Sequence, residues 1–222
     1  MLLGAVWPKA IVFDASGTIL DDLYVVWRAN SEAYESLGLR GIETLEEFRR
    51  KFRLPVPTFH EENGVPPELI RAVDQKFREF YPRYSAQVRI LPEVEVVLEE
   101  LGRRGILLGV ASNIPTSFLK EHLRNFEIEN HFRAIVGQED CEEQKPSPRP
   151  ILTALRKLGV KPPDALYVGD MEEDILAGRR ARVKTCAIAR EESYHPRWKL
   201  ERQNPDYLIS NLRELLDICS TA

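Results

Sequence analysis

One pattern recurs along most of this sequence: a short, continuously apolar run is followed by a longer stretch whose apolar residues have helical spacing. The apolar runs occupy residues 9–14, 105–113, 133–137, 165–170 and 184–189. Strands that are apolar throughout, rather than on one face only, are typical of parallel sheets covered by helices on both faces. The alternation of such strands with helices therefore predicts an α/β fold around a parallel sheet.

Residues 21–88 interrupt this alternation, because no apolar strand run occurs among them. Their helical periodicity predicts helices over 23–37, 43–52 and 69–80. The stretch LPVPTFHEENGVPP at 54–67 contains so many Pro and Gly residues that we expect an irregular loop there. The chain is thus predicted to form two domains, a core of residues 1–20 and 89–222 and an all-helical cap of residues 21–88 inserted after the first strand.

Charge and composition narrow the classes of partner. The 222 residues carry a net charge of −4, so the chain lacks the excess of Lys and Arg that neutralises a nucleic-acid backbone or holds an anionic membrane surface. The apolar start MLLGAVW is too short for a signal peptide or a bilayer span. We expect a cytoplasmic protein with no nucleic-acid or membrane partner, either a monomer or a homodimer.

Polar residues follow three of the predicted strands. Asp14 ends the first strand, Ser112 and Asn113 end the next one along the chain, and Asp170 ends a later one. Each of these residues, taken alone, is more often a turn or cap residue than a functional one. Because ligands of open parallel sheets bind beyond the carboxyl ends of the strands, their joint occurrence predicts one site at that edge.

The charged groups expected at this edge suit a cation together with a small oxyanion. Carboxylates such as those of Asp14, Asp170 and Asp174 repel one another unless a cation lies between them, and oxygen ligands are what Mg²⁺ prefers. Lys145, a serine hydroxyl and the backbone amides of residues 16–18 would supply donors for an anion. The sequence therefore predicts Mg²⁺ beside a phosphate-sized oxyanion.

The order of these motifs resembles that of the haloacid dehalogenase-like superfamily of hydrolases. DASGTI at 14–19, an apolar strand ending in Ser-Asn, Lys-Pro before a helix, and GDMEEDILAG at 169–178 follow one another as they do in that family. The segment 21–88 is similar to the cap of its phosphoglycolate phosphatase-like and 2-haloacid dehalogenase-like branches. The resemblance implies a Rossmann-like three-layer core and a Mg²⁺-dependent phosphatase for a small phosphorylated metabolite.

The resemblance also implies a role for each motif residue. Asp14 would be the nucleophile that forms an aspartyl-phosphate, and the expected catalytic residues are Asp14, Ser16 and Lys145. The residues expected to bind the phosphate are Thr18, Ser112, Asn113 and Lys145. The expected metal ligands are Asp14, the main-chain carbonyl of Ser16, Asp170 and Asp174.

Ser16 departs from the pattern of the family, whose phosphatases usually carry there an aspartate that protonates the leaving oxygen. A serine hydroxyl is a poor proton shuttle, and losing positioned acid–base catalysis typically slows a reaction by about 10²–10⁴-fold. We therefore expect a phosphatase that is slow, or restricted to substrates whose leaving group needs no acid. Three alternatives stay open: a 2-haloacid dehalogenase-like enzyme, a phosphonoacetaldehyde hydrolase-like enzyme with Lys51 as its Schiff-base lysine, and a non-catalytic binding or regulatory protein.

Substrate selection is expected to depend on the cap. Relatives with such an insert place their selecting residues in it, and we expect Arg53 and His60, beside and within the predicted loop, to face the substrate. A surface position for His60 stays open as the alternative. The sequence does not indicate which phosphorylated metabolite is bound.

Overall fold

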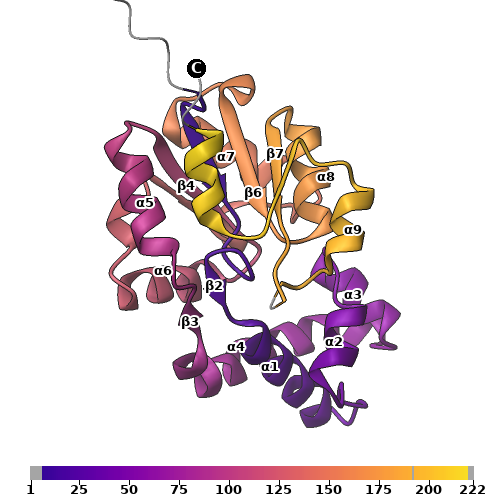
Figure 1. Ribbon diagram of the computed structural model, residues 1–222. Helices are drawn as coiled ribbons and strands as arrows, with labels where there is room; N and C mark the ends of the chain where they lie inside the picture. Colours follow the sequence, from indigo (N-terminus) through magenta and orange to yellow (C-terminus); the bar gives the residue numbers. More distant parts are fainter. Residues whose placement is uncertain (1–6, 192, 220–222) are drawn as a thin grey trace, which may run out of the picture.

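The computed structural model describes residues 7–191 and 193–219 and has the α/β fold that the sequence predicts (Figure 1). The strands of its large sheet are β1 (Ala10–Phe13), β4 (Leu107–Ala111), β5 (Ala134–Val136), β6 (Ala165–Gly169), β7 (Lys184–Ile188) and β8 (Tyr207–Ile209). They are all parallel and lie in the order β5–β4–β1–β6–β7–β8. Each of the five apolar runs contains one of these strands, and β8 follows near the end of the chain.

Helices cover both faces of this sheet, so the three-layer architecture is confirmed. The helices of the core are α5 (Val94–Arg103), α6 (Thr116–Asn125), α7 (Arg149–Leu158), α8 (Glu172–Ala181), α9 (Arg197–Arg202) and α10 (Leu215–Ile218). Ile11 and Phe13 of β1 pack in one apolar cluster with residues of α5, α6 and α10, whereas Ala10 and Val12 pack in another with residues of α7 and α8, because side chains alternate along a strand. None of the helices in the described part of the chain has the length and apolar character needed to cross a bilayer.

The position of β1 decides where polar strand ends meet. β1 lies between β4 and β6, and Phe13 at its end is in register with Val110 of β4 and Val168 of β6. The carboxyl ends of these three strands are therefore level. Asp14 and Asp170, which follow β1 and β6 directly, are brought to the same edge of the sheet.

A helical insert, residues 23–87, lies at this edge of the core (Figure 1). The chain enters and leaves it through a short antiparallel ribbon of β2 (Leu20–Asp21) and β3 (Arg89–Ile90), which the sequence did not predict because two-residue strands show no apolar pattern. Its helices are α1 (Leu23–Ser36), α2 (Leu45–Lys51), α3 (Val56–Glu62) and α4 (Ile70–Tyr84), with 3-10 turns at Pro67–Leu69 and Ser85–Gln87. Helices α1 and α4 pack against each other and form its main body.

The prediction of an irregular loop over residues 54–67 was wrong, because α3 lies inside this stretch. Pro57 occupies the first turn of the helix, where a backbone N–H has no helical partner and proline is tolerated. Gly64, with φ +82°, and Pro66 come only after the helix has ended. The helix-breaking residues thus lie at its ends and leave its interior intact.

Candidate active site

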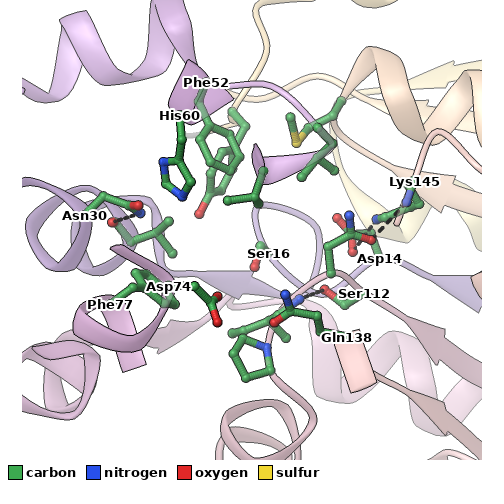
Figure 2. A pocket seen from close by; sticks show the side chains of 18 residues that line it. Asp14, Ser16, Asn30, Phe52, His60, Asp74, Phe77, Ser112, Gln138 and Lys145 are labelled. Atoms are coloured by element: carbon green, nitrogen blue, oxygen red, sulfur yellow. Dashed lines mark hydrogen bonds and ion pairs between the residues drawn. The ribbon is translucent and has the colours of Figure 1, made fainter. Parts of the chain in front are cut away.

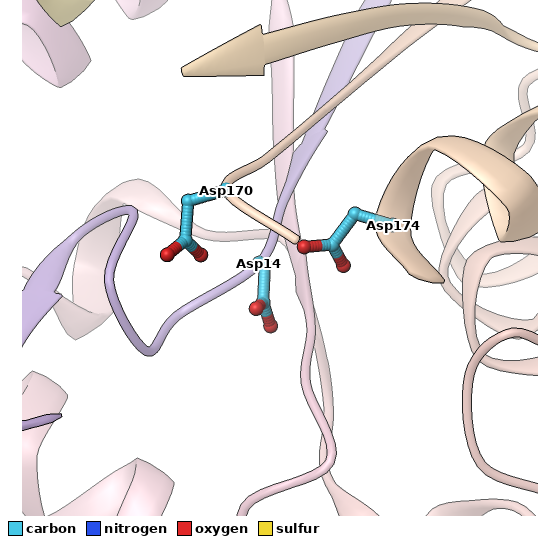
Figure 3. Close-up of side chains that lie close together, drawn as sticks. All are labelled: Asp14, Asp170 and Asp174. Carbon is cyan, nitrogen blue, oxygen red and sulfur yellow. The ribbon is translucent and has the colours of Figure 1, made fainter. Parts of the chain in front are cut away.

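Three buried carboxylates converge at the carboxyl edge of the sheet (Figure 3). Asp14 follows β1, Asp170 follows β6, and Asp174 lies in the first turn of α8. Each offers one oxygen, and these three oxygens lie within 4.8 Å of one another. The structure thus brings together the three acidic residues that the sequence predicted as metal ligands.

Lys145 is the one cationic side chain in contact with this cluster among the described residues. Its Nζ atom lies 2.7 Å from Asp14 Oδ1 and 2.7 Å from Asp174 Oδ1, and it donates to the Tyr167 hydroxyl at 3.1 Å. Burial alone would lower the pKa of Lys145, but the charges of Asp14 and Asp174 outweigh it and raise the pKa to about 12. The lysine therefore stays protonated although it is fully buried.

One lysine does not balance three ionised carboxylates. Burial raises the pKa of Asp14 to about 6 against the opposing effect of Lys145, and burial followed by repulsion from Asp174 and Asp14 raises the pKa of Asp170 well above its usual value. A divalent cation would relieve both effects, and the donors are the carboxylate oxygens that Mg²⁺ prefers. The residues present therefore fit a Mg²⁺ ion.

Asp170 is held in place by the loop after β1 and by a distant backbone amide. Tyr194 N–H donates to Asp170 Oδ2 at 2.7 Å, and the Thr18 hydroxyl donates to Asp170 Oδ1 at 3.3 Å. Gly17, with φ +71°, passes so close that a Cβ on it would lie 2.2 Å from Asp170 Oδ2. The Thr18 hydroxyl is fully buried against Asp170 and does not line the cavity described below, so a contact between Thr18 and the phosphate stays a prediction.

Ser16 is joined to an acidic residue that the sequence analysis missed. The Ser16 hydroxyl donates to Asp22 Oδ2 at 2.6 Å, and the Tyr194 hydroxyl donates to Asp22 Oδ1 at 3.1 Å. Burial raises the pKa of Asp22 to about 7, although both hydrogen bonds act to lower it. In the sequence, Asp22 only precedes a helix and had no feature that marked it as part of a site.

A cavity separates this edge of the core from the helical insert (Figure 2). The core contributes Asp14, Ser16, Ser112, Asn113, Gln138 and Lys145 to its lining. Ser112 is buried after β4, and Asn113 Oδ1 accepts a hydrogen bond from the backbone N–H of Lys145 at 3.3 Å. The predicted serine, asparagine and lysine are therefore side by side on the cavity wall beside Asp14.

The insert forms the opposite wall of the cavity. The two insert residues expected to face the substrate, His60 and Arg53, lie in different surroundings. His60 is buried in α3, lines the cavity and forms a 2.8 Å hydrogen bond with the Tyr34 hydroxyl through Nδ1, so it is not a surface residue. Burial lowers the pKa of His60 to about 4, which leaves it neutral near pH 7. The expectation for Arg53 was wrong: its side chain is exposed and pairs with Glu62 at 3.1 Å.

The orientation of Arg53 follows from its neighbours. Phe52 has extended backbone angles, and both Phe52 and Leu54 line the cavity. Side chains alternate along an extended segment, so the residue between these two points away from the cavity. Lys51 is also outside the cavity lining, and its Nζ pairs with Glu47 Oε1 at 2.6 Å. The lysine considered for a Schiff-base mechanism is therefore not positioned to contact a substrate in the cavity.

Comparison with known proteins gives consistent similarities. A family model described as haloacid dehalogenase-like hydrolase matches residues 11–188. The phosphoglycolate phosphatase of Aquifex aeolicus is 31% identical over 95% of this chain and 96% of its own, and the pyrophosphatase PpaX of Oceanobacillus iheyensis is 30% identical over the same shares. The crystal structure of a hydrolase from Pseudomonas syringae superposes with a TM-score of 0.82 at 22% identity, covering 94% of this chain and 96% of that one, a likeness that concerns the fold.

Proposed function

The chain belongs to the haloacid dehalogenase-like hydrolase family, and on this premise we propose that it is a Mg²⁺-dependent phosphatase that hydrolyses a small phosphorylated metabolite. The observation that carries the proposal is the pairing of Asp14 with Lys145 at 2.7 Å on the cavity wall, with Asp170 and Asp174 behind it. A carboxylate nucleophile, a protonated lysine and an acidic cation site together can catalyse phosphoryl transfer through a covalent intermediate. The names of the two enzyme relatives support a phosphorylated substrate.

Asp14 would act as the nucleophile. Its carboxylate oxygen attacks phosphorus, the bond from phosphorus to the leaving oxygen breaks, and an aspartyl-phosphate forms. Water then attacks the same phosphorus, which releases inorganic phosphate and regenerates Asp14. Ser112, Asn113 and Lys145 line the cavity on either side of this carboxylate and would bind the phosphate oxygens.

The metal site would be made by Asp14, Asp170 and Asp174 together with the main-chain carbonyl of Ser16. When bound there, Mg²⁺ would supply positive charge that neutralises the phosphate oxygens as the attack proceeds. Asp174 is already oriented, since its Oδ2 atom accepts from the backbone N–H of Met171 at 2.9 Å and its Oδ1 atom faces Lys145. Asp174 is therefore held in place without relying on the ion.

Ser16 would limit the rate. Its only hydroxyl proton is donated to Asp22, and a serine at this position cannot deliver a proton as a carboxylic acid does. Esters with good leaving groups would react, whereas alkyl phosphates would react slowly. The helical insert would serve as a cap of residues 21–88 that excludes water from Asp14 and supplies the wall facing the leaving group.

The proposal is tested with p-nitrophenyl phosphate and acetyl phosphate, whose leaving groups need no acid. We expect turnover that requires Mg²⁺ and is lost in Asp14→Asn. Asp164→Asn is the matched control, because Asp164 is an exposed carboxylate that pairs with Lys9 and does not line the cavity. Equal activity of Asp14→Asn and Asp164→Asn would overturn the mechanism. Halide release from a 2-haloacid without Mg²⁺, or no turnover of any phosphate donor, would favour the dehalogenase or the non-catalytic reading instead.

A further inference from the structure

The wall that the helical insert presents to the cavity has an unusual charge character for an enzyme that handles anions. Its apolar part consists of Val26, Phe52, Leu54, Val56 and Phe77. The polar part is limited to the amide of Asn30, the neutral imidazole of His60 and the carboxylate of Asp74 (Figure 2). This wall therefore offers apolar surface, hydrogen-bonding groups and one negative charge, but no positive charge among the described lining residues.

Two arginines of α4 lie near Asp74. Arg71 lines a neighbouring pocket together with Asp74 and His60 but does not line this cavity, and Arg78 is fully engaged. Arg78 Nε donates to Asp74 Oδ2 at 3.0 Å, its Nη1 donates to Glu139 at 2.6 Å and its Nη2 donates to Gln138 at 2.7 Å. All three guanidinium nitrogens therefore donate to side chains of the protein, and these contacts join the insert to the core. The guanidinium does not line the cavity. It is not available to pair with an anionic substrate group.

The positively charged side chain on the core side of the cavity, Lys145, is also paired. Lys145 faces Asp14 and Asp174, and in the proposed reaction it binds the transferred phosphate. Within this cavity, an ester with a second anionic group would place that group beside aromatic rings and the Asp74 carboxylate, with no unpaired cation among the described residues of the lining. Removing an unpaired charge from water into such surroundings is unfavourable and weakens the binding of an anionic ligand.

We propose that the substrate of this site is a phosphate monoester whose alcohol part carries no negative charge and places an apolar surface against Phe52 and Phe77. The inference rests on the proposed phosphatase function and specifies its substrate class. The proposed substrate class does not include the substrates for which the two relatives are named, because phosphoglycolate carries a carboxylate and pyrophosphate carries a second phosphate.

The test compares two ligands of similar size as competitive inhibitors of p-nitrophenyl phosphate turnover. In isobutyl phosphate, an uncharged isopropyl group, a CH that carries two methyl groups, replaces the planar carboxylate of phosphoglycolate. We expect isobutyl phosphate to inhibit at a concentration at least about tenfold lower, which corresponds to a difference of about 1.4 kcal/mol. Phosphoglycolate binding as tightly as isobutyl phosphate, or more tightly, would overturn the inference. An absence of p-nitrophenyl phosphate turnover would instead count against the phosphatase function itself.

A charge introduced into the wall gives an independent readout. Val56 is half-buried and lines the cavity, and its own hydrogen bond to Gln144 is made by the backbone, so its side chain can be replaced. Val56→Lys is expected to shift the preference at least about fivefold toward phosphoglycolate, whereas Val56→Met, of similar length but uncharged, should not. Identical preferences in the two variants would contradict the charge argument even if both proteins fold and turn over p-nitrophenyl phosphate.

Discussion

The Ser16 hydroxyl donates a hydrogen bond of 2.6 Å to the Oδ2 atom of Asp22, six residues further along the chain. The second oxygen of this carboxyl accepts from Tyr194 at 3.1 Å, so both oxygens of a buried acidic group are satisfied. A hydroxyl and a carboxyl thus stand next to Asp14 in a fixed order, with the hydroxyl on the cavity side. The order matters because only a carboxyl facing the cavity could act directly on a leaving group.

Exchanging these two residues tests their order. The double variant Ser16→Asp with Asp22→Ser keeps one hydroxyl and one carboxyl in the pair but turns the carboxyl toward the cavity. We expect its turnover of isobutyl phosphate to rise at least about tenfold, as expected for restored acid–base catalysis. Ser16→Asp alone should be less stable by about 2 kcal/mol, because two carboxyls would share one buried site. A double variant no faster than the wild type would refute the assignment of Ser16 as the limiting residue.

Lys145 is expected to stabilise the fold as well as to bind phosphate. Lys145→Met leaves the buried carboxylates of Asp14 and Asp174 without their partner, and breaking a buried pair in this way typically costs about 3–5 kcal/mol. Lys184→Met is the control, because Lys184 is 55% exposed and pairs with Asp206 at 2.7 Å on the surface. There the loss should be below about 1 kcal/mol. Urea unfolding measures both, and equal losses would contradict the prediction.

His60 should make stability depend on pH. Burial lowers its pKa from 6.5 to about 4, so between these values the unfolded chain binds the proton more readily than the folded one. The stabilisation is complete above pH 6.5 and is lost as the pH falls toward about 4. Relative to His60→Gln, the wild type should lose about 2 kcal/mol of unfolding free energy between about pH 7 and about pH 4.5. A constant difference across this range would be the opposite result, and His131→Gln, a histidine outside the cavity lining, serves as the control.

Gly17 should tolerate no side chain. A Cβ there combines an unfavourable φ of +71° with an approach of 2.2 Å to the Asp170 carboxylate, so Gly17→Ala should displace Asp170 and destabilise the protein by more than about 2 kcal/mol. Gly64 has a similar φ of +82° but open space around it, so Gly64→Ala should cost only about 1 kcal/mol. Thermal unfolding of the two variants separates crowding from backbone strain, and similar losses would mean that the contact with Asp170 is unimportant.

The sequence alone determined the α/β core and the residues at its carboxyl edge. Runs such as 165–170 are apolar throughout because both faces of their strands are buried, and this burial leaves a local pattern in the sequence. The acidic residues that follow β1 and β6 could be nominated together because parallel strands must end at a common edge. These features depend on chain neighbours and on a general rule of sheet geometry.

Tertiary structure alone decided the surroundings of that edge. The site of Asp22 is completed by Tyr194, which lies 172 residues away, and no local pattern specifies such a contact. Arg53 faces solvent because its neighbours Phe52 and Leu54 turn toward the cavity, which depends on where the insert packs. Whether a polar side chain is buried, paired or exposed is set by long-range packing, so the charge character of the cavity wall, and with it the proposed class of substrate, emerged only when the insert and core were seen together.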